Sequence, residues 1–191
     1  MYQMFYLKKA IIELIEKYPS LENTIQTIHI DHKKPCNYIN NKQIPLIFPL
    51  YLKNYIEKLP KTKTKNYHFI GTINSNRKWL YNYRSDSSLI ELNRRGRDPE
   101  KKFQLDERYY KTMCASKFTL TPTGDYNWSY RFFEAILCFS IPVFDPESLD
   151  VFKKDYFYYT TEDKHVYNLD KALENYNRFI NSSHFLSMEA M

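Results

Sequence analysis

The feature that most constrains the fold is an alternation of short apolar runs with longer helical stretches across residues 66 to 160. Strands are predicted at 66–73, 117–124, 141–145 and 156–161. Helices are predicted at 76–95, with a break near Ser85 as an alternative, and at 105–116 and 127–139. Strands separated by helices favour βαβ units. We therefore expect an α/β fold with a Rossmann-like parallel sheet and helices on both faces.

The rest of the chain is less regular. The first 18 residues carry the pattern of an amphipathic helix that ends before Pro19. Further elements are expected as a strand at 24–30, helices at 50–59 and 169–183, and a charged link at 61–65. A chain of 191 residues suits one domain. We expect a single Rossmann-like domain over 1–191, in which residues 1–60 match the alternation less clearly than the core at 66–160.

The composition limits the classes of partner. Hydrophobic residues make up 43% of the chain, which is enough for a packed core. A formal net charge of +6 favours anionic partners such as nucleotides and phosphates. The basic residues are scattered and form no stripe, and no base-stacking motif accompanies them, so we expect no nucleic-acid partner.

The cysteines and the N-terminal segment bear on the compartment. Cys36, Cys114 and Cys138 form no close pairs, which favours reduced thiols in a cytoplasm over a disulfide framework. The first 20 residues mix Lys and Glu into their apolar pattern, unlike a signal peptide or a membrane span. We expect a cytoplasmic location, and membrane association is not indicated.

The segment from 117 to 144 is the main candidate site. It is predicted to run from a strand through a loop into a helix, and ligands of open parallel sheets bind at the carboxyl ends of the strands. The N-terminus of the helix offers unpaired backbone N–H groups and a partial positive charge to an anion. Ser129 and Arg131 could add a hydroxyl and a full charge to a phosphate or diphosphate.

Glu134 has two interpretations. It lies three residues after Arg131, so the two side chains share a helix face. Glu134 could accept two hydrogen bonds from a ribose diol while Arg131 meets the diphosphate. Alternatively, the pair is a surface salt bridge that contributes roughly 0.2–0.5 kcal/mol. Spacing alone favours the salt bridge, although a cation in the first helical turn costs about 0.3–1 kcal/mol and weakens that interpretation.

A second polar cluster lies at 29–36. Its His and Cys spacing matches no standard zinc pattern, so we expect no metal site there. Asp31 or His32 could be a catalytic general base if an acceptor binds nearby, but polar residues at a strand end explain both without a function. No motif decides between these alternatives.

The residues from 109 to 144 also resemble the signature of exostosin-like glycosyltransferases. The resemblance covers about residues 66–160, and it includes the Phe-x-Gly of the upstream strand followed by a basic residue. The matching residues of the main signature are Ser116, Lys117, Phe118, Pro122, Gly124, Ser129, Arg131, Glu134, Ala135, Ile141, Pro142 and Val143.

This resemblance implies the donor-binding half of a GT-B glycosyltransferase, which needs no bound metal or other cofactor. The donor would be a UDP- or GDP-linked sugar, the acceptor a carbohydrate or glycan, and the transfer inverting. Carried over to this chain, Arg131 and Ser129 would meet the diphosphate and Glu134 the ribose. Gly71 would allow close backbone approach and Arg77 would be a second phosphate contact. The loop near the donor sugar would be shaped by Pro122, Thr123 and Gly124.

Two features depart from that family. The family has glycine where Phe139 follows the helix, and a left-handed cap there is costly for Phe. A GT-B enzyme also has two Rossmann-like halves, whereas this chain has room for little more than one. We therefore keep an alternative, in which the chain is a non-catalytic nucleotide- or glycan-binding module, or a half-enzyme completed by a partner chain.

Overall fold

The structure is a computed structural model. It describes residues 2–31, 34, 36–72, 75–93, 106–123, 128–145, 155–182 and 184–185. The chain divides into two compact units. Unit 1 comprises residues 1–55 and 178–191, and unit 2 comprises residues 56–177. Among the described residues, no helix has the length and apolar character needed to cross a bilayer.

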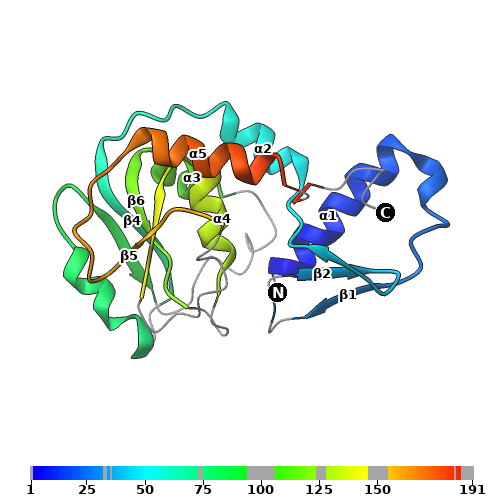
Figure 1. Cartoon of the computed structure of the whole chain (residues 1–191), viewed down its shortest axis with the longest axis horizontal. Coiled ribbons are helices and arrows are strands. Elements are labelled where there is room, and N and C mark those ends of the chain that lie inside the picture. The colour runs from blue at the N-terminus through cyan, green and yellow to red at the C-terminus, as the bar shows by residue number, and fades with distance from the viewer. Residues whose placement is uncertain are drawn as a thin grey trace. The chain divides into compact units, whose positions relative to one another are not determined.

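Unit 2 contains a five-stranded parallel sheet in the order β5-β4-β6-β7-β8. Figure 1 labels the first three of these strands, β5, β4 and β6. The strands of the sheet are β4 (Lys65–Thr72), β5 (Leu89–Asn93), β6 (Ser116–Leu120), β7 (Ile141–Phe144) and β8 (Tyr159–Thr160). The register places Tyr67 beside Phe118, and Phe118 beside Ile141. The expected α/β fold with a parallel sheet is therefore confirmed.

Helical elements cover both faces of this sheet. On one face, the 3-10 helix η2 (Ser75–Tyr83) and helix α5 (Leu169–Ile180) supply Leu80 and Ala172 to a core built on the strands. On the other face, α3 (Glu107–Cys114) packs against β4 and β6, and α4 (Tyr130–Leu137) packs against β6 and β7. Period-two alternation separates the faces, since Phe69 joins the first core while His68 contacts Tyr109 of α3.

Unit 1 joins helix α1 (Tyr2–Lys17) to an antiparallel sheet of β1 (Ile28–Asp31), β2 (Cys36–Ile39) and β3 (Lys42–Pro45). The buried stripe of α1 has helical spacing and packs with the sheet. Its members are Leu7, Ala10, Ile11 and Leu14. As predicted, α1 ends before Pro19. The short helix η1 (Pro19–Leu21) follows, and α2 (Leu50–Glu57) begins at the end of this unit.

Two local features differ from the predictions. The helix expected at 76–95 is broken near Ser85, as the alternative had it, but the part before the break is the 3-10 helix η2 and the part after it is strand β5, in which Leu89 begins a pairing with β4. The hairpin β2–β3 was not expected. Asn40 and Asn41 make its two-residue turn with φ values of 49° and 64°, a conformation that Asn tolerates better than most residues.

Candidate functional site

The parallel sheet has a topological switch point between β4 and β6. Counted along the chain, the strand order is 2-1-3-4-5, so the direction in which the chain crosses the sheet reverses beside β4. Helix η2, after β4, and helix α3, before β6, lie on opposite faces. Ligands of such sheets bind beyond the carboxyl ends of the strands at this point. Seven residues predicted as donor-binding lie on the strands, loops and helix around it.

Helix α4 begins at this edge of the sheet. Ser129 is its N-cap, and the Ser129 hydroxyl accepts a hydrogen bond from the backbone N–H of Arg131 at 3.2 Å. Every residue of α4 is buried except Arg131, which is half-buried. The helix therefore packs all round, and its one accessible position is a cation at the end where the helix dipole repels cations.

The Arg131 guanidinium lies over the end of β4. Nη2 donates to the carbonyl of Ile70 at 2.9 Å. The guanidinium stacks on the ring of Phe69, with Cζ of Arg131 4.2 Å from the ring centroid. Nε donates to the hydroxyl of Tyr109 at 3.2 Å. Within the described part of the chain, Arg131 forms no ion pair with a carboxylate, and Nη1 makes no hydrogen bond. The guanidinium is therefore held in place, while its Nη1 group remains available to donate a hydrogen bond.

Gly71 lies close to two of these side chains. A Cβ atom added there would lie 3.0 Å from Arg131 Nη2 and 3.0 Å from Cζ of Phe69, so a larger residue would require both to shift. The close approach of a donor to the Gly71 backbone stays a prediction.

Arg77 ties the ends of two strands together. Its Nη1 donates to the carbonyl of Thr72 at 2.7 Å, and its Nε and Nη2 donate to the carbonyl of Thr123 at 3.2 and 3.1 Å. Pro122 is buried beside Thr123 in the loop after β6. Arg77 therefore closes the switch point by clamping both loops, and Gly124 lies outside the described residues.

Glu134 lies one helical turn below Arg131 and is only 3% exposed. Its Oε2 accepts from the hydroxyl of Tyr109 at 2.8 Å, and its Oε1 accepts from the hydroxyl of Tyr110 at 3.0 Å. Burial, followed by the charge of Glu134, raises the pKa of Tyr130 well above its ordinary value. The pair Arg131 and Glu134 is thus no surface salt bridge, because Glu134 is buried and the Tyr109 hydroxyl connects the two side chains.

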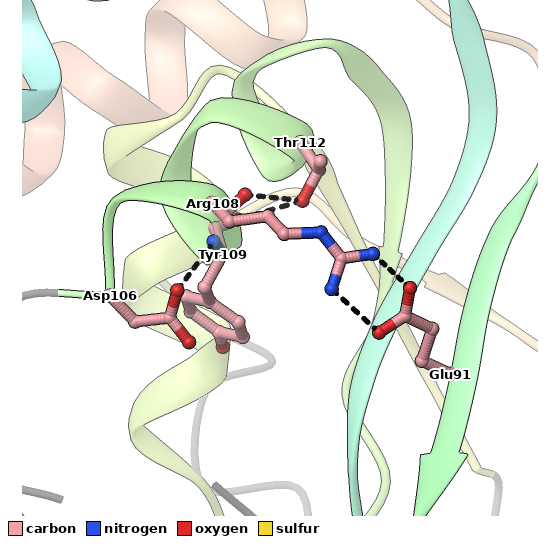
Figure 2. Close-up of polar contacts among 5 residues, drawn as sticks. All are labelled: Glu91, Asp106, Arg108, Tyr109 and Thr112. Atoms are coloured by element: carbon pink, nitrogen blue, oxygen red, sulfur yellow. Dashed lines mark hydrogen bonds and ion pairs between the residues drawn. The ribbon is translucent and has the colours of Figure 1, made fainter. Parts of the chain in front are cut away.

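Contacts at the start of α3 fix the backbone of Tyr109 and link the helix to the sheet (Figure 2). Asp106 is the N-cap of α3 and accepts from the backbone N–H of Tyr109 at 3.0 Å. The guanidinium of Arg108 reaches both carboxylate oxygens of Glu91 on β5. This ion pair is exposed, so it contributes little energy but links α3 to the sheet.

Sequence reasoning gave no role to Tyr109 and Tyr110. The signal was present as two adjacent tyrosines in a predicted helix just before β6, but only the fold shows that their hydroxyls converge on Glu134. Of the other candidates, Asp31 is the last residue of β1 in unit 1 and lies outside unit 2. His32 lies outside the described residues.

Within the described ranges, no three His, Cys, Asp or Glu side chains come together as metal ligands would. No protein-family model matches the chain, and no curated protein matches it.

Proposed function

We propose that unit 2 binds a nucleotide sugar, linked to UDP or GDP, and that the protein transfers the sugar to a glycan acceptor. The main support for the proposal comes from the contacts and the position of Arg131. It is a fixed guanidinium with spare donors and no carboxylate ion pair in the described structure, at the switch point of a parallel sheet. A diphosphate would supply the missing negative charge.

The neighbouring groups suit a diphosphate. Arg77 and Arg131 donate to backbone carbonyls two residues apart on β4, at Thr72 and Ile70, which are about 7 Å apart along a strand. The Ser129 hydroxyl accepts from the backbone and still has its own proton to donate. The start of α4 adds its partial positive charge.

In the proposed reaction, an acceptor hydroxyl attacks the anomeric carbon of the donor sugar and the nucleoside diphosphate leaves. The bond from the anomeric carbon to the diphosphate oxygen breaks as the new glycosidic bond forms, with inversion. The guanidinium groups would stabilise the negative charge that develops on the leaving diphosphate. The acceptor hydroxyl gives its proton to a general base, so that the products are the glycoside and the nucleoside diphosphate.

The ribose contact of Glu134 stays a prediction. Each carboxylate oxygen already accepts a tyrosine hydroxyl, so a ribose diol would have to share or replace these donors. A Glu134→Gln variant tests this point with two probes. Weaker binding of UDP with unchanged binding of inorganic pyrophosphate, which has no ribose, would support the contact.

A binding module without catalysis, or a half-enzyme that needs a partner chain, is the second candidate. It is favoured by the sheet of unit 1, which is small and antiparallel, so the described part of the chain holds one Rossmann-like sheet. The three free cysteines are buried, which is in keeping with the proposed cytoplasmic location.

The test is binding followed by turnover. We expect UDP or GDP to raise the melting temperature, and Arg131→Ala to abolish the rise. Arg84→Ala, which removes one exposed cation elsewhere in unit 2, is the matched control and should keep it. If neither nucleotide binds the folded wild type, the proposal fails. If binding occurs without donor hydrolysis or sugar transfer, the module is favoured.

A further inference from the structure

Tyr109 stands between the two charged side chains of α4. Its hydroxyl accepts from Nε of Arg131 at 3.2 Å and donates to Oε2 of Glu134 at 2.8 Å. Side chains three residues apart on a helix are neighbours, and opposite charges at that spacing ordinarily attract each other directly. Here the contact runs through the tyrosine hydroxyl.

We propose that Tyr109 is a positioning residue whose hydroxyl keeps Arg131 from pairing with Glu134 and so leaves the guanidinium available to a diphosphate. The role of the diphosphate rests on the proposed function. The separation of the two charges is a property of the structure and can be tested without a ligand.

The physical argument starts from the buried carboxylate. A carboxylate that is 3% exposed must receive hydrogen bonds, because an unpaired buried charge is costly. Tyr109 supplies one of its two tyrosine hydroxyls. Without that hydroxyl, Arg131 is a strong donor three residues away on the same helix, and arginine forms two-pronged ion pairs with carboxylates.

Such a pair would change the site. The guanidinium would turn inward toward Glu134, and its bond to the carbonyl of Ile70 at the strand end would weaken or break. Donors that now remain unused would be taken up by the carboxylate. The net charge of the site would be unchanged, but its affinity for an anion would fall.

Tyr110 provides a matched control. It is also buried, at 2% exposure against 0% for Tyr109, and its hydroxyl also donates to Glu134, at 3.0 Å. It is not a partner of Arg131. Tyr109→Phe and Tyr110→Phe therefore remove the same group from the same carboxylate, and only the first removes the separation from Arg131.

The first measurement is NMR of the arginine Nε–H group, assigned with an Arg131→Lys variant. In the wild type we expect an Arg131 Nε–H that exchanges slowly with water, because it is bonded to Tyr109. This signal should shift markedly in Tyr109→Phe and little in Tyr110→Phe. A rapidly exchanging wild-type signal, or equal shifts in the two variants, would overturn the proposal. The wild-type result stands even if a variant fails to fold.

The second measurement is calorimetric binding of inorganic pyrophosphate. Tyr109→Phe should weaken binding about tenfold, the loss expected for one charged contact, while Tyr110→Phe stays within about twofold. Adding Glu134→Gln to Tyr109→Phe removes the attraction and should restore most of the affinity. A role in core packing alone predicts no such rescue, and its absence would count against the proposal.

The two proposals fail in different ways. If the wild type binds neither pyrophosphate nor UDP, the proposed function and the role of the diphosphate both fall, and the NMR signals alone decide whether Tyr109 separates the charges. If the wild type binds and both tyrosine variants lose affinity equally, the proposed function stands and the role of Tyr109 is wrong.

Discussion

The two ends of the parallel sheet in unit 2 each hold a cation beside helix ends, and the surroundings of the two cations differ. At the amino end, Lys63 precedes β4 and its amine donates to the carbonyls of Cys114 at 2.7 Å and Cys138 at 2.9 Å. Cys114 is the last residue of α3 and Cys138 is the C-cap of α4. Carbonyls at helix C-termini attract a cation, so the fold supplies Lys63 with acceptors that offset part of the cost of burying its charge.

At the carboxyl end the situation is reversed. Arg131 lies in the first turn of α4, where the helix dipole costs about 0.3–1 kcal/mol for a cation. Its partners are the neutral oxygens of Ile70 and Tyr109 and the ring of Phe69. These contacts hold the side chain but give its charge no carboxylate counter-ion within the described residues, and the proposed diphosphate would supply one.

The largest effect that we expect from this comparison is the pH dependence of the unfolding free energy at Lys63. Burial lowers the pKa of Lys63 from 10.5 to about 8, which corresponds to about 3 kcal/mol because one pKa unit is 1.36 kcal/mol. The unfolded chain binds more protons between these values, so stability should rise with pH across that window. We expect the unfolding free energy of wild type minus that of Lys63→Met to increase by up to about 3 kcal/mol from pH 7 to 10.5.

The control is the cation at the other end. Arginine stays charged over this range, so the difference between wild type and Arg131→Met should be nearly flat with pH. Urea denaturation at three pH values measures both differences. A flat Lys63 difference would mean that its amine is well hydrated in the folded protein and that burial does not lower its pKa.

Gly71 gives the next largest effect. Gly71→Ala places a methyl group 3.0 Å from Arg131 Nη2 and Phe69 Cζ, and crowding of this kind costs about 1–2 kcal/mol. The guanidinium should move, and pyrophosphate affinity should fall about tenfold. Thr72→Ala is the control, because Arg77 binds the Thr72 backbone carbonyl and that contact survives. Unchanged affinity in Gly71→Ala would show that the position of Arg131 does not matter for the ligand.

Much of this architecture was predictable from the sequence. The strands β4, β6 and β7 and the helices α3 and α4 follow from apolar runs and caps, and they bring the loops after β4 and β6 to one edge. Ser129, Arg131, Gly71 and Arg77 were predicted together and lie around that edge.

The contacts that decide the chemistry were not predictable in the same way. Lys63 belongs to a segment predicted as a charged link, and its partners are the ends of two helices 51 and 75 residues away. The hydroxyls of Tyr109 and Tyr110 meet Glu134 across 25 and 24 residues. Periodicity places residues on faces, but it does not reveal which polar atoms converge when two helices pack.

The smallest predicted effect concerns the turn that closes the amino end. Phe139 adopts φ 55°, and Phe139 N donates to the carbonyl of Ile136 while Ser140 N donates to that of Ala135, as in a Schellman motif. The left-handed cap is thus formed by Phe, at a position where glycine is the usual residue. The ring of Phe139 packs on that of Tyr176 with the ring centroids 4.6 Å apart, and this contact offsets part of the backbone cost.

Two substitutions separate the backbone cost of the left-handed conformation from the packing of the Phe139 ring. Phe139→Ala and Phe139→Gly both remove the ring, but only glycine relieves the left-handed backbone, so the glycine variant should be more stable by about 1 kcal/mol. Thermal unfolding of the pair measures the difference. An alanine variant as stable as the glycine variant would mean that the turn relaxes without Phe139. The position of the Cys138 carbonyl, which accepts from Lys63, would then depend less on the turn and more on the hydrogen bond from the lysine.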